Sequence, residues 1–427
     1  MGHFIENPRS SCALGGALAF VSSIDRAIPV LHAGPGCGLQ ATAGQLGQSG
    51  GKSFGYVGGQ GTPSTNMFER EIIFGGVERL RETIAGTLEI MDGDLIFVLT
   101  GCTADIIGDD VESVIEEFKA QGVNIVHTET AGFKGDSYYG YNAVVQSIAD
   151  QLTEVVPKDA KLVNLFGIVP AQDIFWEGNF EEIIRILNKL GLKVNSFCKE
   201  QQGLKEIKNS AGAAINIMLS PWLGQEFLAT YKEKYDIDTF RYPGLPVGPT
   251  ATTDFIRKLA KQLGLDNVLV EKVIAEEENY VYSYLEKIIG SFTRYRFSIV
   301  GDTNTVLGLT RFLVNDFGRI PLVAVITDQV PEEHRNTIER ELTSLEYARP
   351  PKVVFENDKW KISELIKEYK DDVAFILGSD YEKEIGKKLD ALTVVVSFPT
   401  TEKLIINRGY AGYRGCLTFI EDLYDNN

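Results

Sequence analysis

The sequence has few of the residues and segments that mark several large classes of protein. Its 427 residues include only five cysteines, too sparse for a disulfide framework, so we expect a reducing, cytoplasmic compartment. No apolar run reaches about eighteen residues, the length that indicates a membrane span. Basic residues number 42 against 59 acidic ones, and the net charge of −17 argues against nucleic acid or an anionic membrane as partner. Residues 1–7 lack the charged and apolar regions of a secretory signal.

Apolar runs alternate with amphipathic segments along the whole chain. Ile28–Leu31 and Leu95–Leu99 are uninterrupted apolar runs of the kind that forms buried parallel strands. A chain of 427 residues is too long for one ordinary core. The alternation therefore predicts an α/β protein with three doubly wound, Rossmann-like parallel-sheet domains, which span residues 1–157, 158–292 and 293–427.

Some segments support more local predictions. The spacing of apolar residues predicts one helix over Phe74–Ile90 and a strand over Val194–Cys198. Pro221 is expected at the first position of a helix, where the missing N–H is not needed. Gly38–Ser49 is expected to form a short helix. The following Gly50–Ser53 matches a phosphate-binding loop poorly, so we interpret it as a turn.

Three of the cysteines lie in glycine-rich loops near the start of the chain. The loops are Cys12–Gly16, Gly34–Gly38 around Cys37, and Gly101–Thr103 around Cys102. A thiolate at the C-terminal end of a parallel strand faces the crevice where open α/β sheets hold ligands, and glycine lets the backbone approach a bulky inorganic core. A single buried cysteine is usually inert, and no CxxC spacing is present. Three cysteines at such junctions nevertheless favour an iron–sulfur cluster held by cysteine sulfur.

The motifs around these cysteines occur in a specific order, and weaker similarity continues to the C-terminus. They are Cys12–Gly16, Gly34–Cys37, Ser64–Glu69, Phe74–Gly76 and Thr100–Asp110. In order and spacing they resemble the component 1 chains of nitrogenase, and the β-type chain most closely. The resemblance implies that Cys12, Cys37 and Cys102 hold this chain's half of a P-cluster-type iron–sulfur cluster (8Fe–7S), which is shared with an α-type chain.

The second and third predicted domains indicate which type of chain this is. In the catalytic α-type chain, a cysteine after a strand of the middle domain and a histidine in the last domain hold a metal cofactor. Here Ser220 follows the strand Ile215–Leu219, and the loop Phe398–Lys403 contains no histidine. The resemblance therefore implies the electron-relay β-type subunit of an α₂β₂ complex. Its electrons would come from an ATP-dependent iron protein and pass to a metal cofactor in the α-type chain.

Two departures from the molybdenum-type chain leave other activities open. Gly132 stands where that chain has an additional serine ligand, and the N-terminal extension of that type is missing. A nitrogenase-like reductase with another substrate, such as a methylthio-alkane reductase, is one alternative. Others are a cofactor-assembly scaffold subunit and a four-iron (4Fe–4S) relay chain, as in protochlorophyllide reductases and related tetrapyrrole cyclases. Scaffold chains of the β type keep fewer of the three cysteines, which favours the catalytic complex.

Phe74 stands at the family position where the iron protein meets component 1. The resemblance implies that Phe74 is a docking contact for this reductase. Gly75 and Gly76 would give a partner close access to the backbone beside an exposed aromatic side chain. The alternative is that Phe74 packs in the core beside Val77, as most isolated phenylalanines do.

The remaining cysteines and two of the histidines have simpler interpretations. Cys198 and Cys416 fall on predicted regular elements and are expected to be structural. His32 and His127 lie near the ends of predicted strands, where a hydrogen bond beside the cluster and an ordinary core position are both open. The acidic residues that follow Cys102 are expected to cap a helix start; they are Asp105, Asp109 and Asp110.

Overall fold

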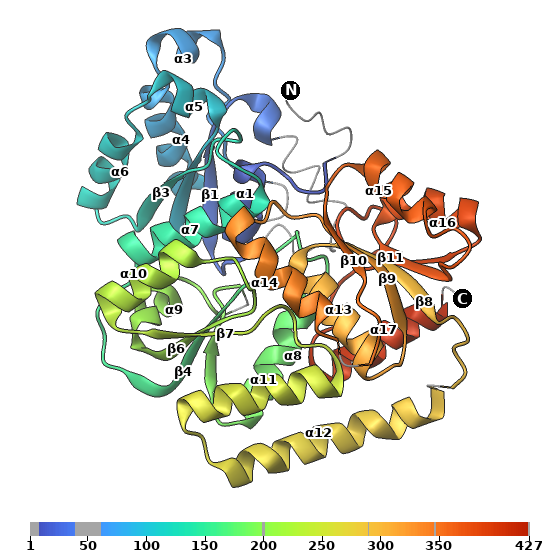
Figure 1. Cartoon of the computed structure of the whole chain (residues 1–427). Helices are drawn as coiled ribbons and strands as arrows, with labels where there is room; N and C mark the ends of the chain where they lie inside the picture. Colours follow the sequence, from blue (N-terminus) through green and yellow to red (C-terminus); the bar gives the residue numbers. More distant parts are fainter. Residues whose placement is uncertain (1–7, 39–60, 199–200, 289, 346, 426–427) are drawn as a thin grey trace.

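The chain forms three parallel sheets with helices on their faces, as Figure 1 shows. The predicted fold class, doubly wound α/β units with parallel sheets, is confirmed. No helix within the described part of the chain is long and apolar enough to cross a membrane. The predicted helix and turn within residues 39–60 lie outside the described residues. The computed structural model describes residues 8–38, 61–198, 201–288, 290–345 and 347–425.

The first sheet has the strand order β1-β2-β3. Its register pairs His32 with Thr100 and Thr100 with Glu129, so the three parallel strands end at one common edge. Along β1, Val30 faces a core formed with α4 and α6, whereas Leu31 faces the core shared with α1 and α7. The elements are α1 (Ala13–Ser23), β1 (Ala27–His32), α3 (Glu69–Phe74), α4 (Val77–Ile90), β2 (Leu95–Thr100), α5 (Cys102–Ile107), α6 (Val111–Ala120), β3 (Ile125–Glu129) and α7 (Ser137–Gln151).

The second sheet has the order β5-β4-β6-β7. A row of buried amides crosses it, because Asn164 donates to Asn216 at 2.8 Å and accepts from Asn195 at 3.2 Å. Each amide thus finds a partner on the neighbouring strand, which offsets part of the cost of burying it, although Asn195 Oδ1 and Asn216 Nδ2 have no partner among the described residues. The elements are β4 (Asp159–Phe166), α8 (Trp176–Lys189), β5 (Lys193–Asn195), α9 (Leu204–Lys208), η2 (Asn209–Gly212), β6 (Ala213–Met218), α10 (Gln225–Tyr235), β7 (Asp238–Arg241), α11 (Gly248–Leu263) and α12 (Asn267–Ile288).

The third sheet has the order β10-β9-β8-β11-β12. Its residues alternate between two cores, since Val300 and Ile376 pack with α15 and α16, whereas Ile299 and Leu377 face the larger core. The elements are β8 (Arg296–Gly301), α13 (Thr303–Asn315), β9 (Ile320–Ile326), α14 (Glu332–Thr343), β10 (Lys352–Phe355), α15 (Lys359–Lys367), β11 (Phe375–Gly378), η3 (Asp380–Glu382), α16 (Lys383–Leu389), β12 (Leu392–Val395) and α17 (Gly412–Asp425).

One buried apolar core runs through all three sheets. The last helix, α17, packs against α8, α11 and α12, which belong to the elements of the second sheet. The domain boundaries at residues 157/158 and 292/293 therefore stay a prediction.

The single helix predicted over Phe74–Ile90 is wrong at its start. Helix α3 ends at Phe74, and α4 begins only at Val77. Between them Gly75 has φ 90°, a left-handed conformation that glycine adopts readily and that ends the helix. Phe74 is therefore the last residue of a short helix and not the first residue of a long one.

Two further local predictions are wrong. Strand β5 ends at Asn195, and Phe197 has φ 61°, so Cys198 follows the strand in an irregular segment. Pro221 does not open a helix. Helix α10 begins at Gln225, after Gly224 has adopted a left-handed φ of 77°.

Helices α1 and α7 cross in backbone contact. A Cβ on Gly16 would lie 2.2 Å from the Ser137 carbonyl oxygen, and one on Gly140 would lie 2.0 Å from the Ala13 carbonyl oxygen. Only glycine permits so close an approach. Because Cys12 is the N-cap residue of α1, this crossing also sets where Cys12 lies.

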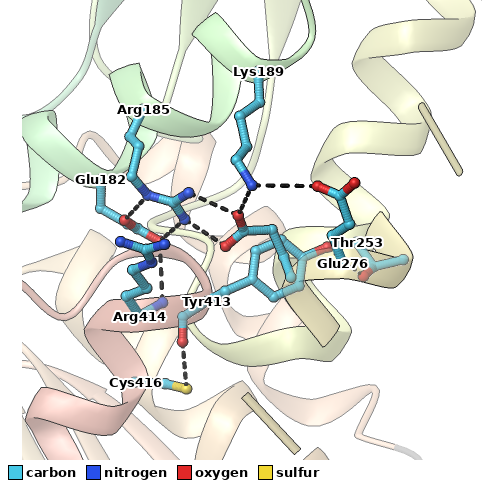
Figure 2. A network of polar contacts seen from close by, with 9 residues as sticks. Glu182, Arg185, Lys189, Thr253, Glu276, Tyr413, Arg414 and Cys416 are labelled. Atoms are coloured by element: carbon cyan, nitrogen blue, oxygen red, sulfur yellow. Dashed lines mark hydrogen bonds and ion pairs between the residues drawn. The ribbon is translucent and has the colours of Figure 1, made fainter. Parts of the chain in front are cut away.

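A network of ion pairs and hydrogen bonds joins α8, α12 and α17 (Figure 2). The Arg185 guanidinium donates to both carboxylate oxygens of the buried Glu277, at 2.7 and 2.6 Å, and also to Glu182. Lys189 lies 2.6 Å from Glu277, and Glu182 accepts the Arg414 N–H of α17 at 3.0 Å. Burial alone raises the pKa of Glu277, but the hydrogen bonds from Arg185 and Lys189 outweigh it and lower this pKa to about 2.

Gly16→Ala is expected to lower the free energy of unfolding by about 1–3 kcal/mol, the range for overpacking, because the new methyl group meets a backbone oxygen. Gly86→Ala on α4 is the matched control, since nothing lies within 4 Å of its added Cβ. Alanine at that position should stabilise the helix by roughly 0.5–1 kcal/mol. Urea denaturation of both variants checks this, and undiminished stability of Gly16→Ala would show that the crossing tolerates a side chain.

Glu277→Gln is expected to lower the free energy of unfolding by about 3 kcal/mol at neutral pH, because it removes the buried carboxylate that Arg185 and Lys189 share. Since the pKa of folded Glu277 is about 2 instead of the ordinary 4.5, its contribution is present above that ordinary value and is lost as the pH falls toward 2. The variant should therefore lose less stability than the wild type over that acid range. Denaturation curves at several pH values measure both effects.

The control for Glu277→Gln is Glu276→Gln. Glu276 lies on the same helix with a half-exposed side chain and a longer contact of 3.5 Å to Lys189. Its replacement should change stability by no more than about 0.5 kcal/mol. Equal effects at the two positions would contradict the importance of the buried pair.

Candidate metal centre

Cys12 reaches the site through the packing of the N-terminal segment. It caps α1 with an extended backbone and makes no capping hydrogen bond with its side chain. An antiparallel bridge pairs Cys12 with Asp136, and the Ala13 N–H donates to the Gly135 carbonyl at 3.0 Å. The residue is exposed in this chain. The loop before α7 therefore holds the backbone of Cys12 and leaves its sulfur accessible.

Cys102 is the first residue of α5 and follows β2 directly. Its Sγ accepts the Gly132 N–H at 3.1 Å. A Cβ on Gly132 would lie 3.3 Å from the Cys102 sulfur and 3.5 Å from the Cys12 sulfur. The sulfurs of Cys12 and Cys102 thus both lie next to Gly132, although they are 90 positions apart in the sequence.

Cys37 completes the group in the helical turn after β1. Its N–H donates to the Gly34 carbonyl at 3.1 Å, and its side chain is half-buried against the main core. Burial and the neighbouring thiols of Cys102 and Cys12 raise the pKa of Cys37. Cys12, Cys37 and Gly132 line one cavity of about 420 Å³. The structure thus brings the three cysteine loops of the sequence analysis together.

The chemistry of these donors fits an iron–sulfur cluster better than a single ion. Among the residues that the structure describes, no three His, Cys, Asp or Glu side chains lie close enough to share one metal ion. The thiolates around a polynuclear cluster bind different iron atoms, so they stand further apart, around a larger volume. Two soft sulfurs at one cavity, and a third that accepts the N–H of the cavity residue Gly132, match that requirement. Their role as ligands stays a prediction.

The other two cysteines lie away from this group, in the core. Cys198 is 3% exposed, and burial raises its pKa to about 12. Cys416 is fully buried on α17, where its thiol donates to the Tyr413 carbonyl at 3.1 Å. Buried neutral thiols of this kind act as small apolar side chains.

His32 has a polar partner that the sequence did not indicate. Its Nε2 lies 2.9 Å from the Asp109 carboxylate, and both groups are buried. Burial lowers the pKa of His32, although the contact with Asp109 opposes this shift. Asp109 also accepts the Gly76 N–H at 3.0 and 2.9 Å, which fixes the turn between α3 and α4. The strand that leads to Cys37 is thereby tied to that turn.

The acidic residues after Cys102 have separate roles. Only Asp110 caps a helix, accepting the Ser113 N–H of α6 at 3.1 Å. Asp105 accepts the Thr100 hydroxyl at 2.5 Å and pairs with Lys134 at 3.0 Å. The prediction of a shared capping role is thus confirmed for Asp110 and is wrong for Asp109, whose partners come from the distant β1 and the α3–α4 turn.

Exposed apolar side chains gather on α3, α5 and the loop after β3. Phe74 is 82% exposed, so it is not a core residue in this chain. Helix α3 packs against α5, which begins at Cys102. The other large exposed side chains of these segments are Phe68, Ile72, Ile73, Ile106 and Phe133.

Ser220, the residue expected where an α-type chain has a cysteine ligand, is held by protein contacts. Ser220 is fully buried, and its Oγ accepts the N–H groups of Trp222 and Leu223 at 3.4 and 3.2 Å. The Trp222 indole donates to Asp328 at 2.9 Å, and its ring lies 5.6 Å from that of Tyr138. Burial and the nearby carboxylate of Asp302 raise the pKa of Asp328 to about 7.

The chain matches the family model of nitrogenase component 1 type oxidoreductases over residues 12–426. Among known proteins it is similar to the β chain of the nitrogenase molybdenum–iron protein of Bradyrhizobium diazoefficiens, with 23% identity over 98% of this chain and 83% of the relative. It is also similar to the β chain of the nitrogenase vanadium–iron protein of Trichormus variabilis, with 24% identity over 96% and 91%.

A third relative is the nitrogenase iron–molybdenum cofactor biosynthesis protein NifE of Methanococcus maripaludis, with 22% identity over 88% of this chain and 76% of the relative. The fold is similar to that of nitrogenase Cp1 solved at pH 6.5, with a TM-score of 0.84 and 19% identity over 100% of this chain and 93% of the other. Because the family model matches nearly the whole chain, this protein belongs to the family of nitrogenase component 1 type oxidoreductases.

Proposed function

We propose that this chain is the β-type, electron-relay subunit of a nitrogenase or nitrogenase-like reductase. The observation that carries the proposal is the convergence of three thiols. Cys12 and Cys37 line one cavity together with Gly132, and the Cys102 sulfur lies against Gly132. Three thiols from loops far apart in the sequence meet where a cluster could be held. The β chains of molybdenum–iron and vanadium–iron nitrogenases among its relatives support the same role.

The three cysteines would hold this chain's half of a P-cluster-type 8Fe–7S cluster. Such a cluster, when bound, accepts and releases single electrons. Gly132 contributes an N–H to the Cys102 sulfur, and hydrogen bonds to cluster sulfur favour the reduced, more negative state. Gly132 has no side chain that could add an oxygen ligand. The thiols of Cys12 and Cys37 face the cavity from α1 and from the turn after β1.

The site needs a second chain for completion. Cys12 is exposed in this chain, which is unfavourable for a cluster that must exclude water. An α-type component 1 chain that supplies the other half would cover it, in an α₂β₂ complex within a reducing cytoplasm. Exposed apolar residues on α5 and in the loop after β3 lie next to the same loops. Their burial in the complex would stabilise association.

The chain would relay electrons without reducing the substrate itself. Ser220 is occupied by backbone N–H groups, and Trp222 and Tyr138 pack beside it. A serine so placed offers no soft ligand for a metal cofactor. Electrons from an ATP-dependent iron protein would pass through the shared cluster to a cofactor in the α-type chain.

A cofactor-assembly scaffold is the second candidate, because NifE is among the relatives at a similar identity. A scaffold of that kind, or a four-iron relay chain as in protochlorophyllide reductases, would hold a 4Fe–4S cluster. Iron analysis of the purified complex separates these functions. We expect about eight iron atoms in the cluster shared by each pair of chains, whereas four would favour one of the alternatives.

Cys37→Ser is expected to lower the iron content and to weaken association with the α-type chain, because cluster binding and assembly are coupled. Serine oxygen is a poor replacement for a soft thiolate ligand of iron. Metal analysis and size-exclusion chromatography of the co-produced chains measure the two effects. Cys198→Ala is the control, since that buried cysteine lies in the core. Unchanged iron and assembly in single serine variants of all three site cysteines would contradict the proposal.

Phe74→Ala is expected to lower reductase-driven turnover about tenfold, the loss for one good interface contact of about 1.4 kcal/mol. Iron content and the melting temperature should stay near wild type, because the side chain is 82% exposed. A small-molecule reductant should still reduce the cluster.

Ile90→Ala provides the control for Phe74→Ala. Ile90 is 83% exposed at the end of α4, and it should affect neither turnover nor stability. Wild-type turnover in Phe74→Ala would exclude the docking role. A parallel loss of iron would instead assign Phe74 to the contact with the α-type chain.

A further inference from the structure

Arg9 is a fully buried cation only three residues before Cys12. Its side chain forms a bidentate pair with Glu382, with Nη2 to Oε1 at 2.5 Å and Nη1 to Oε2 at 3.1 Å. The exposed fractions of the two side chains are 0% and 1%. Nη1 also donates to the Ser379 hydroxyl at 3.1 Å. The guanidinium of Arg9 thus lies among elements of the third sheet, at the end of β11.

The carboxylate of Glu382 is itself held in place. It accepts the Ser379 N–H and the Ser379 hydroxyl, each at 2.8 Å, within the short helix η3. The ring of Tyr381 lies 5.2 Å from the guanidinium carbon of Arg9. Paired, bidentate geometry of this kind fixes orientation as well as distance. Arg9 therefore has a rigid anchor and little freedom to move.

The backbone around Cys12, from Arg9 to Ala13, is hydrogen-bonded to Gln172, which follows β4, and to the loop before α7. The Arg9 carbonyl accepts the Gln172 side-chain amide at 2.8 Å, and the Gln172 oxygen accepts the Ser137 hydroxyl at 2.7 Å. On the other side of Cys12, the Ala13 N–H donates to the Gly135 carbonyl. Cys12 stands between these two anchors without a side-chain cap of its own. The position of its sulfur is therefore set by its neighbours.

We propose that Arg9 is a positioning residue for the metal centre, and that its pair with Glu382 holds the Cys12 sulfur opposite that of Cys102. The elements of the third sheet, which carry none of the three cysteines, would thereby be required for a complete site. The metal part of this inference rests on the proposed function, whereas the placement of the two thiols can be tested without any metal.

The test uses the metal-free, full-length chain and phenylarsine oxide, a reagent that binds two thiols only when they are close together. In the wild type the Cys12 and Cys102 sulfurs both lie within 3.5 Å of the Cβ position of residue 132. We expect Arg9→Gln to weaken the binding of the arsenical to the Cys12–Cys102 pair by about tenfold or more. A Cys12→Ala variant gives the background binding without this pair, and peptide mapping identifies the two cysteines that are bound. The same variant, co-produced with the α-type chain, should retain less iron.

Arg185→Gln is the matched control. It breaks an ion pair on α8 and α12, which carry none of the site cysteines (Figure 2). The carboxylate of this pair is buried like that of Glu382, whereas its guanidinium is 24% exposed. It should lower the melting temperature while leaving arsenical capture and iron at wild-type levels. Equal losses of capture in Arg9→Gln and Arg185→Gln would show a general effect of destabilisation and overturn the inference.

A double variant, Arg9→Met with Glu382→Leu, keeps the test decisive if Arg9→Gln fails to fold. Apolar replacement of both partners of a buried pair commonly preserves stability. It removes the directional bonds, however, so capture should still be weaker than in the wild type.

Wild-type capture in a folded Arg9 variant would overturn the inference. Absence of iron from the wild-type complex would refute the proposed function. Arsenical binding in the metal-free chain would then still decide whether Arg9 positions the Cys12 thiol.

Discussion

The crossing of α1 and α7 is the contact on which the cysteine site depends. Parallel strands that end at one edge bring Cys37 and Cys102 together through topology alone. Cys12 follows no strand, and it arrives only because α1 lies against the start of α7 at backbone distance. Gly16 and Gly140 allow that approach. The loop before α7 then makes two hydrogen bonds: the Gly135 carbonyl accepts the N–H of the residue after Cys12, and the Gly132 N–H donates to the Cys102 sulfur. Two helices that packed at an ordinary distance would leave one sulfur out of the group.

Much of the architecture could be predicted because apolar runs and helical spacing are local signals. Strands β1 and β2 lie where uninterrupted apolar runs predicted them, and the alternation of elements indicated parallel sheets. The errors came from backbone conformations, as at Gly75 and Phe197, which composition does not reveal. The convergence of the cysteines could be inferred from strand ends, but the contacts that hold them could not. Arg9 meets a partner 373 residues away, and nothing near it in the sequence marks that pairing.

The strand ends of the three sheets serve three different purposes in one chain. In the first sheet they carry sulfur and glycine, which leave room at a cavity. In the second, Ser220 and Trp222 close the corresponding region with hydrogen bonds and an aromatic ring. In the third, Asp302 caps α13, and Asp328 binds the Trp222 indole. The same topology therefore leaves a cavity at the strand ends of the first sheet, whereas hydrogen bonds and packing fill the described strand ends of the second and third.

The pairing of Arg9 with Glu382 also orders events during synthesis of the chain. Glu382 lies 373 residues after Arg9, so the native surroundings of residues 8–12 cannot exist until the third sheet has been synthesised. Earlier, the arginine has no buried partner and this segment must remain in water, because an unpaired guanidinium cannot be buried at low cost. The first cysteine to be synthesised is thus among the last parts of the site to take its place. Any ligand that needs all three thiols would therefore meet an incomplete set until Glu382 has been synthesised.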